Sequence, residues 1–377
     1  MVGLSHREIG SVALFFYRLT GSGGAERMIC QLAGALAERD FRVHLASWDP
    51  PDAKAFYPLH PAVRWERLGF HAGIADKLRR TRALARVLKD NRVRVLLGFV
   101  ISGDRTVYAA VKLAGARLVA AERNAPAMYK LRYNCLQRWL GLRFLHLADR
   151  ITVQMPEFIA GYPDSLHDRI EVIPNPVPVA LRKARPGLAN EAGRFTLLAV
   201  SRLDAVQKCV DRLIVAFSLV AAHNPAWDLR IIGDGPERET LHRLASEHGV
   251  ADRVSIAPAA ADIFDVYVHA HLFAIPSLWE GFPNALAEAM SHGLPAVGFE
   301  DAAGVAELIR SGGGGWLAKG LEDEHALGAA LDHAMADGEQ RAHRGKLAAQ
   351  SMAAFAPEAQ FDRWAALLKS LHTEHAS

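Results

Sequence analysis

The sequence predicts an α/β protein made of two doubly wound domains, each built on a mainly parallel sheet. The chain has 377 residues, 50% of them hydrophobic, which is enough for two cores of ordinary size. Short apolar runs alternate with helical stretches through both halves, as in parallel α/β domains. Between the halves, residues 172–179 are rich in proline and residues 182–191 are polar, which is typical of a linker. We therefore expect one domain over residues 1–178 and another over 179–356.

The expected strands are short apolar runs. In the first half they cover residues 12–16, 93–100 and 150–154, with a further run that ends just before Glu122; in the second half they cover 229–232 and 272–275, with a further run that ends near Val200. Open parallel sheets bind ligands outside the carboxyl ends of their strands. The residues that follow these runs are therefore the candidates for a site.

Two carboxylates, Glu280 and Glu288, bracket the junction between the strand 272–275 and a short helix expected over 284–292. The start of such a helix favours anions through its unpaired N–H groups and the positive end of its dipole, so a diphosphate fits there. Glu288 lies one turn into the helix, and Glu280 lies just before the helix. Both carboxylates can accept hydrogen bonds from ribose and sugar hydroxyls there. The alternative is that both are ordinary surface residues of an amphipathic helix.

Two cations follow the strand that ends near Val200. Arg202 offers a planar fork and Lys208 a point charge, a combination suited to a diphosphate leaving group; otherwise they are solvated surface charges. After the next strand, Gly233-Asp234-Gly235-Pro236 reads as a tight turn with Pro236 in the first turn of a helix. Taken by itself, such a turn can be purely structural.

The first half has a weaker phosphate signal. The strand 12–16 is followed by a loop with Gly23 and Gly24 that enters a helix. The loop lacks the spacing of a dinucleotide fingerprint and the Gly-Lys-Ser/Thr of a phosphate-binding loop, so it is either a ligand loop or a tight turn.

The phrase from Glu280 to Met290 resembles the family 4 retaining glycosyltransferases, whose hallmark is a Glu, seven residues and a second Glu. Arg202-Leu203 with Lys208, the Gly-Asp-Gly-Pro turn and the early Gly-Gly are similar to further motifs of that family. The resemblance implies two facing Rossmann-like domains, the GT-B architecture, with the helix in residues 357–377 crossing back to the first domain. Two positions depart from the family, which usually has Gly at Cys209 and a Glu-His or His-Glu pair at Glu122-Arg123.

The resemblance also implies a mechanism, namely retaining transfer of a hexose or N-acetylhexosamine from a UDP-sugar to a glycan or polyprenyl-diphosphate-linked hydroxyl. It makes Glu280, Arg202, Lys208 and Arg123 catalytic and implies no cofactor and no bound metal. The donor would be bound by Gly23, Gly24, Arg202, Lys208, Gly233, Gly235, Glu280, Gly281, Phe282, Pro283, Asn284, Ala285, Leu286 and Glu288. The acceptor would be bound by Glu122, Arg123 and Asn124, unless Arg123 instead pairs with Glu122.

Other functions stay open at this stage. A GDP-mannose-dependent mannosyltransferase would use the same motifs. A nucleotide-sugar epimerase or hydrolase would turn over donor without an acceptor, and a non-catalytic scaffold would bind nucleotide without turnover.

Net charge and apolar runs bear on partners and location. A formal net charge of +3 does not indicate a nucleic-acid binder, and Cys30, Cys135 and Cys209 show no zinc spacing and are expected to be reduced thiols. No apolar run reaches the roughly 18 residues of a membrane span, so we expect a cytoplasmic protein. Basic amphipathic stretches at 77–89 and 128–147 suggest peripheral attachment to the anionic inner leaflet; the alternative is that each simply faces core and water.

Overall fold

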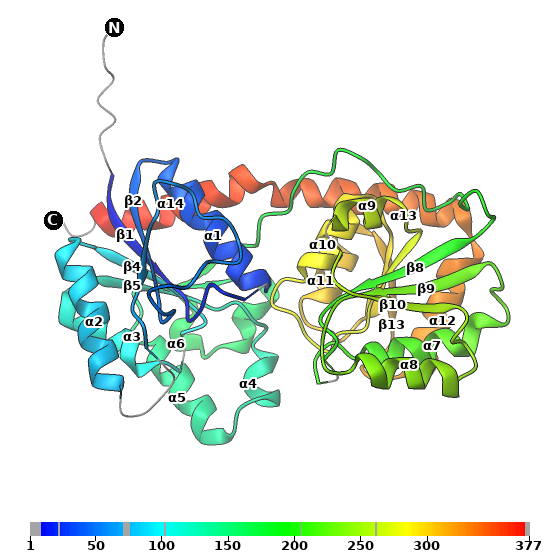
Figure 1. The fold of residues 1–377 in the computed structure, drawn as a ribbon, viewed down its shortest axis with the longest axis horizontal. Helices are drawn as coiled ribbons and strands as arrows, with labels where there is room; N and C mark the ends of the chain where they lie inside the picture. The colour runs from blue at the N-terminus through cyan, green and yellow to red at the C-terminus, as the bar shows by residue number, and fades with distance from the viewer. Residues whose placement is uncertain are drawn as a thin grey trace, which may run out of the picture. The chain divides into compact units, whose positions relative to one another are not determined.

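The computed structural model describes residues 9–21, 23–70, 76–101, 103–204, 206–260 and 262–373. The chain divides into two compact units (Figure 1). The first contains the residues up to Asn175 together with those from Glu358 onward, and the second runs from Pro176 to Pro357. The boundaries expected from the sequence, after residues 178 and 356, lie three residues later and one residue earlier than these divisions.

The first unit is built on a parallel seven-stranded sheet of order β3-β2-β1-β4-β5-β6-β7. Its strands are β1 (Gly10–Phe15), β2 (Phe41–Ser47), β3 (Arg64–Arg67), β4 (Val95–Phe99), β5 (Arg117–Ala121), β6 (Arg150–Val153) and β7 (Ile170–Val172). The central strand β1 is buried almost throughout, and its Val12 pairs with Val43 on one side and Val95 on the other. The predicted doubly wound parallel sheet is confirmed.

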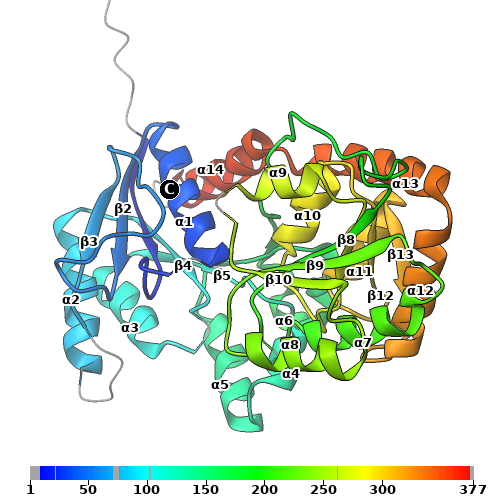
Figure 2. The ribbon, with the colours of Figure 1, turned by 45° about the vertical axis from the view of Figure 1, so that its right-hand side comes forward.

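Helices cover both faces of this sheet (Figures 1 and 2). On one face α1 (Gly24–Ala37) and α14 (Pro357–Thr373) share a core in which Leu14, Leu32 and Trp364 are fully buried. On the other face α2 (Lys77–Asp90) packs against α3 (Arg105–Ala114). The remaining helices of the unit are α4 (Ala127–Leu131), α5 (Cys135–Leu145), η1 (Pro156–Gly161) and α6 (Asp164–His167).

The second unit has a parallel six-stranded sheet of order β10-β9-β8-β11-β12-β13. Its strands are β8 (Phe195–Val200), β9 (Trp227–Ile232), β10 (Val254–Ala257), β11 (Leu272–Ile275), β12 (Ala296–Phe299) and β13 (Gly315–Ala318). Its helices are α7 (Val210–Ala221), α8 (Arg238–Glu247), α9 (Ile263–Val268), α10 (Asn284–Ser291), α11 (Val305–Gly312), α12 (Glu324–Ala336), α13 (Gly338–Ser351) and η2 (Met352–Phe355). Because α8 begins at Arg238, Pro236 precedes the helix and does not lie in its first turn as predicted.

Each sheet has one place where the chain reverses the direction in which strands are added. In the first unit this switch point lies between β1 and β4, and in the second it lies between β8 and β11. At a switch point the loops leave neighbouring strands in opposite directions, which opens a crevice for ligands beyond the carboxyl ends. The fold therefore directs attention to the loops after these four strands.

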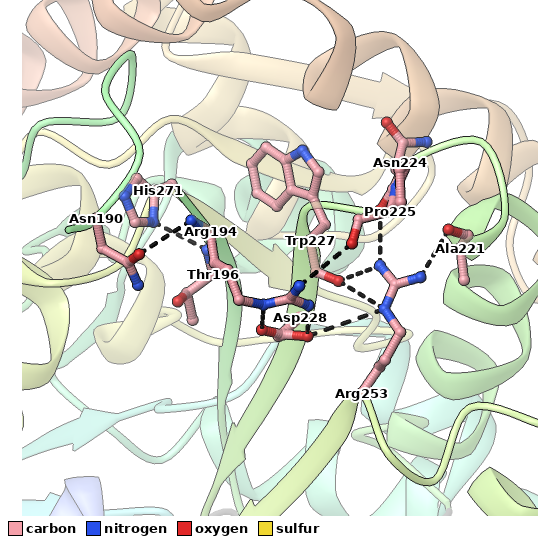
Figure 3. A network of polar contacts seen from close by, with 10 residues as sticks. All are labelled: Asn190, Arg194, Thr196, Ala221, Asn224, Pro225, Trp227, Asp228, Arg253 and His271. Carbon is pink, nitrogen blue, oxygen red and sulfur yellow. Dashed lines mark hydrogen bonds and ion pairs between the residues drawn. The ribbon is translucent and has the colours of Figure 1, made fainter. Parts of the chain in front are cut away.

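A polar network stabilises the opposite, amino-terminal edge of the second sheet (Figure 3). The Arg194 guanidinium, just before β8, donates to both carboxylate oxygens of Asp228 on β9. Arg253 donates to the backbone carbonyls of Ala221, Asn224 and Trp227. These contacts connect strand ends and helix ends at the edge of the sheet opposite the switch point. We therefore infer that they stabilise the fold and do not bind a ligand.

No helix within the described ranges is long and apolar enough to cross a membrane. The two basic stretches are helical, but they differ in exposure. On α2 the hydrophobic residues Leu84 and Leu88 face the core, and Arg80 is itself buried, only 8% exposed. Arg80, one of the cations of the basic stretch 77–89, does not lie on its solvent-facing surface, because it occupies the same helix stripe as Leu84 and Leu88, at spacings of four and eight residues.

Candidate functional site

The second unit's switch point holds a close ion pair. The Lys208 ammonium lies 2.5 Å from Glu280 Oε1, with side chains only 15% and 10% exposed. Lys208 follows β8 and Glu280 follows β11, so the pair bridges the two loops that flank the crevice. A cation and a carboxylate predicted from separate motifs thus lie together.

Backbone and amide contacts hold these two loops in register. The Gln207 side chain donates to the Trp279 carbonyl at 2.9 Å, and the Leu278 amide donates to the Gln207 carbonyl at 3.0 Å. The loop after β12 adds a third support, since the Glu280 amide donates to the Ala303 carbonyl at 2.9 Å. A Cβ at Gly304 would lie 2.4 Å from the Glu280 carbonyl oxygen, so only glycine fits beside it.

Cys209, which departs from the family motif, has a left-handed backbone conformation with φ 46° and ψ 43° at the start of α7. Glycine adopts this conformation without steric cost, whereas a residue with a Cβ is strained there. The helix still begins at Val210, directly after Lys208 and Cys209. Strain is concentrated next to the site's cation, where it is common in functional loops.

The second carboxylate of the motif, Glu288, is buried on α10 and is held by a residue that the sequence did not reveal. The Tyr267 hydroxyl donates to Glu288 Oε2 at 3.2 Å, and Tyr267 is fully buried. The His292 ring packs beside the Tyr267 ring with centroids 5.3 Å apart. Burial lowers the pKa of His292, so the ring stays neutral near pH 7.

The turn between the two carboxylates is well packed. Gly281 and Phe282 are buried, and the Phe282 ring meets Phe355 edge-on with centroids 5.5 Å apart. The first turn of α10, at Asn284, has no side-chain cap because Pro283 precedes it. The N–H groups of Ala285 and Leu286, in this first turn, therefore have no capping side chain as acceptor.

Arg202 and the Gly-Asp-Gly turn lie side by side. Arg202 is exposed, and no carboxylate among the described residues forms an ion pair with it. A Cβ at Gly233 would lie 1.8 Å from the Ser201 carbonyl oxygen, and one at Gly235 would lie 2.2 Å from that of Leu203. Both glycines are thus needed for the turn to support the loop that carries Arg202.

In the first unit, Gly23 caps the start of α1 and Gly24 is its first residue. The Glu26 carboxylate folds back over this loop, so that a Cβ at Gly23 would lie 2.4 Å from Glu26 Oε2. The predicted glycine loop entering a helix is confirmed, and a carboxylate from its own helix covers it.

Glu122, Arg123 and Asn124 follow β5 in the first unit. Glu122 is buried and accepts hydrogen bonds from the hydroxyls of Tyr129, at 2.6 Å, and Tyr162, at 3.4 Å. The buried Arg123 guanidinium donates to Asn175 Oδ1 and lies over the Phe99 ring, 5.0 Å from its centroid. The alternative of a Glu122–Arg123 ion pair stays a prediction, and Asn124 is half-buried.

Burial shapes the electrostatics at Arg123. It lowers the pKa of the guanidinium to about 9, which leaves it charged at neutral pH. No described residue accepts a hydrogen bond from its Nη1. Burial also raises the pKa of the Tyr162 hydroxyl, with the Glu122 charge adding to the effect, so Tyr162 remains a hydrogen-bond donor.

The structure therefore brings together, in one unit, the residues predicted to bind the donor from that half of the chain: Arg202, Lys208, Gly233, Gly235, Glu280, Gly281, Phe282, Pro283, Asn284, Ala285, Leu286 and Glu288. Gly23, Gly24, Glu122, Arg123 and Asn124 belong to the other unit. Sequence reasoning missed Gln207, Tyr267 and Gly304, which act through tertiary contacts. Within the described ranges, no group of three or more His, Cys, Asp or Glu side chains is arranged to hold a metal.

Comparison with solved structures defines the class. A sucrose-phosphate synthase from Thermosynechococcus elongatus superposes with a TM-score of 0.81 at 19% identity, covering 97% of this chain and 99% of that one. HepE from Anabaena, solved in complex with UDP and glucose, superposes with a TM-score of 0.73 at 17% identity, covering 95% and 99%. The protein has the GT-B fold.

Sequence comparison gives the family. The family described as "Glycosyltransferase Family 4" matches residues 22–181, and that described as "Glycosyl transferases group 1" matches residues 182–351. The chain belongs to the group 1, family 4 glycosyltransferases.

Two curated relatives are similar to different extents. An uncharacterized glycosyltransferase of Haemophilus influenzae is 26% identical over 81% of this chain and 85% of its own length. The amylovoran biosynthesis glycosyltransferase AmsD of Erwinia amylovora is 29% identical over 45% of this chain, and the match spans 46% of that relative.

Proposed function

We propose that the protein transfers a hexose or N-acetylhexosamine, with retention of anomeric configuration and without a metal, from a UDP-sugar to a hydroxyl of a lipid-linked or other glycan acceptor. The observation that carries the proposal is the Lys208–Glu280 pair at the switch point. Glu288, which follows Glu280 on α10, accepts a hydrogen bond from Tyr267. Arg202 lies on the same loop as Lys208. This set offers cations for a diphosphate and carboxylates for sugar hydroxyls.

The mechanism follows from these side chains. Arg202 and Lys208 stabilise the diphosphate as the bond between the anomeric carbon and the phosphate oxygen breaks. The N–H groups of Ala285 and Leu286, in the first turn of α10, share that charge. The acceptor oxygen forms the new bond on the face that the diphosphate leaves, and its proton passes to the departing phosphate, so no protein nucleophile is required.

The two carboxylates have separate tasks. Glu280 holds the donor sugar through its hydroxyls, and its contact with Lys208 places the sugar beside the leaving group. Glu288 accepts hydrogen bonds from the ribose, with its orientation fixed by the Tyr267 hydroxyl. In the first unit, Gly23 and Gly24 approach the donor or acceptor, and Glu122, Arg123 and Asn124 bind the acceptor.

The donor is proposed to be a UDP-sugar because HepE, which shares the fold, binds UDP and glucose. A GDP-mannose donor is the second candidate, since ribose and diphosphate contacts do not distinguish the bases. The acceptor is proposed to belong to bacterial surface polysaccharide or glycoprotein glycan assembly, because AmsD acts in amylovoran biosynthesis.

We also propose peripheral contact with the anionic cytoplasmic leaflet through α4 and α5. Leu131, Leu136 and Trp139 are 59%, 65% and 58% exposed, which is unusual for large apolar side chains clustered in one segment. Exposed cations interleave with them at Lys130, Arg132, Arg138 and Arg143, and residues 125–148 contain no Asp or Glu. Apolar side chains with basic neighbours match an anionic lipid surface.

The proposal is tested with labelled UDP-glucose, UDP-galactose and UDP-N-acetylglucosamine, each incubated with and without lipid-linked glycans extracted from bacterial membranes. Label that moves to the lipid fraction only when protein and acceptor are both present supports transfer. Donor turnover without acceptor would instead indicate an epimerase or hydrolase, and nucleotide binding with no turnover would indicate a scaffold. A parallel series with GDP-mannose tests the second donor.

A further inference from the structure

The first unit has its own switch point, and two polar side chains flank it. Tyr17 follows β1 and Asp104 follows β4, and the charge of the Asp104 carboxylate acts on the Tyr17 hydroxyl. The same carboxylate caps α3 by accepting from the Thr106 amide at 2.9 Å. Burial and then the Asp104 charge raise the pKa of Tyr17, so its hydroxyl remains protonated.

A buried cation lies beside this pair. Arg80, in the first turn of α2, is only 8% exposed, and its charge acts on the Tyr17 hydroxyl. Its guanidinium lies over the Trp48 ring, 4.6 Å from the centroid, and Trp48 directly follows β2. Since helices in such folds start at the carboxyl edge of the sheet, Arg80 is positioned at the same edge as the switch point.

The Arg80 guanidinium is incompletely satisfied. Its Nε is buried, and among the described residues neither this atom nor the Trp48 Nε1 has a hydrogen-bond partner. In the part of the chain that the structure describes, no carboxylate forms an ion pair with Arg80. The nearby carboxylates are already engaged, Asp104 as above and Asp49 by the Leu19 amide at 2.8 Å.

Another buried arginine, Arg341, differs from Arg80 because its guanidinium is hydrogen-bonded. Arg341 in the second unit is 2% exposed and also stacks on an aromatic ring, that of Phe195. Its guanidinium, however, donates to the carbonyls of Pro186, Ala334 and Met335. Buried charges are normally paired or fully hydrogen-bonded, and aromatic stacking recovers only part of the lost hydration.

The loop after β4 adds backbone strain at the same place. Val100 has a left-handed φ of 57°, which a β-branched residue rarely adopts, and its amide donates to the Ala121 carbonyl at 2.9 Å. Such strain persists where the surrounding structure imposes it and is concentrated at ligand sites.

We propose that Arg80, over Trp48 and beside Tyr17, is the subsite for an anionic group on the acceptor, with a phosphate or diphosphate as the chemical class of ligand. An anion supplies the acceptor that Arg80 Nε lacks, and the Trp48 Nε1–H is a second unpartnered donor. The inference rests on the proposed function, because it assigns the first unit's switch point to the acceptor. It predicts that acceptors are charged next to the sugar and that neutral glycans are poor substrates.

The test is calorimetric titration of inorganic diphosphate into the full chain saturated with UDP, so that the second unit's site is filled. One diphosphate should bind per chain, and Arg80→Met should weaken this binding at least tenfold. Arg79→Met is the matched control, because the Arg79 side chain is 79% exposed on the same helix and should leave the affinity unchanged. Geranylgeranyl diphosphate is titrated in parallel, and tighter binding of this probe identifies a lipid-linked ligand, whereas equal binding identifies the free anion.

No binding of diphosphate or of the prenyl probe to the wild-type chain would overturn the inference, as would wild-type affinity in Arg80→Met. If that variant fails to fold, Arg80→Lys replaces it, and a loss of at least fivefold is expected because an ammonium cannot present the guanidinium fork. Wild-type affinity in Arg80→Lys as the sole folded variant would equally overturn it. UDP binding is recorded in each titration, so failure of the donor site is distinguished from failure of this subsite.

Discussion

Lys208 and Glu280, 72 residues apart in the chain, form an ion pair of 2.5 Å that joins the loops after β8 and β11. Each of the two side chains is nearly buried, so neither charge is well hydrated. Burying such a pair is costly unless other contacts repay it, which makes it weak evidence for stability and better evidence for function. A diphosphate oxygen that binds Lys208 would therefore lie beside the donor sugar that Glu280 holds.

The first prediction concerns the cations. Lys208→Ala or Arg202→Ala should lower the transfer rate at least a hundredfold, about 3 kcal/mol of lost stabilisation of the diphosphate leaving group. Initial rates at saturating donor and acceptor measure this. Arg230→Ala, an exposed arginine on β9, is the control and should transfer at the normal rate. Near-normal rates in either cation variant would refute the assigned role.

The second prediction concerns Tyr267. Tyr267→Phe removes the hydroxyl that donates to Glu288 Oε2 and should raise the UDP Kd about tenfold, because hydrogen bonds to charged groups contribute roughly 1.5–3 kcal/mol. Calorimetry measures the affinity, and a melting curve checks the fold. Tyr162→Phe, which loses a comparable contact to Glu122 in the other unit, should leave the UDP Kd unchanged. An unchanged Kd in Tyr267→Phe would remove Tyr267 from the site.

The third prediction uses the left-handed backbone at Cys209. Glycine should be more stable than alanine here, by about 1 kcal/mol, because alanine is strained at positive φ. Cys30, buried inside α1, is the matched control. There the order should reverse, and the free energy of unfolding of the alanine variant should exceed that of the glycine variant by about 1 kcal/mol. Urea denaturation of the four variants gives both differences. The same order at both positions would contradict the strain at Cys209.

The fourth prediction concerns pH. Burial lowers the pKa of His271 from its usual 6.5 to about 4, and its Nδ1 accepts the Thr196 amide, which requires the neutral ring. The unfolded chain therefore binds a proton at higher pH than the folded one, and His271 should destabilise the fold progressively as pH falls from about 6.5 toward 4. His271→Gln should reduce this slope relative to wild type in melting curves between pH 7 and 5. An unchanged slope would exclude His271 as a source.

The fifth prediction concerns the α4–α5 surface. Trp139→Ala combined with Arg132→Gln and Arg138→Gln should abolish co-flotation with anionic vesicles of phosphatidylglycerol, because both apolar and electrostatic contacts are lost. Arg79→Gln with Arg82→Gln on α2 is the control and should still float. Equal recovery with neutral and anionic vesicles, unaffected by the substitutions at Arg132, Arg138 and Trp139, would exclude this surface as a membrane contact.

The strands and the motif were accessible from the sequence because they are local patterns. Apolar runs such as 229–232 and 272–275 fall within the strands Trp227–Ile232 and Leu272–Ile275, and the helix after Pro283 begins at Asn284 as expected. The burial of Arg80 also had a local signal, since it lies on the stripe of Leu84 and Leu88 on α2. The high density of positive charge on the same helix instead suggested a surface that faces an anionic membrane.

Other parts of the site depend on packing between distant segments. Tyr267 reaches Glu288 because α9 and α10 come together around the sheet, and no spacing between them in the sequence indicates it. Gly304 is required by the Glu280 carbonyl that passes beside it, a contact between loops after different strands. Glu122 accepts hydrogen bonds from the hydroxyls of Tyr129 and Tyr162, which lie 7 and 40 residues away along the chain.

The measurement that tests the account most directly is calorimetric binding of UDP and GDP, with a chelator present, to the intact protein and to Glu288→Ala. The proposed donor site should give micromolar UDP binding that persists in chelator and is lost in the variant, since Glu288 holds the ribose. A preference for GDP would keep the site and change the donor to a GDP-sugar. Absence of binding by either nucleotide, or UDP binding unaffected by Glu288→Ala, would contradict the account.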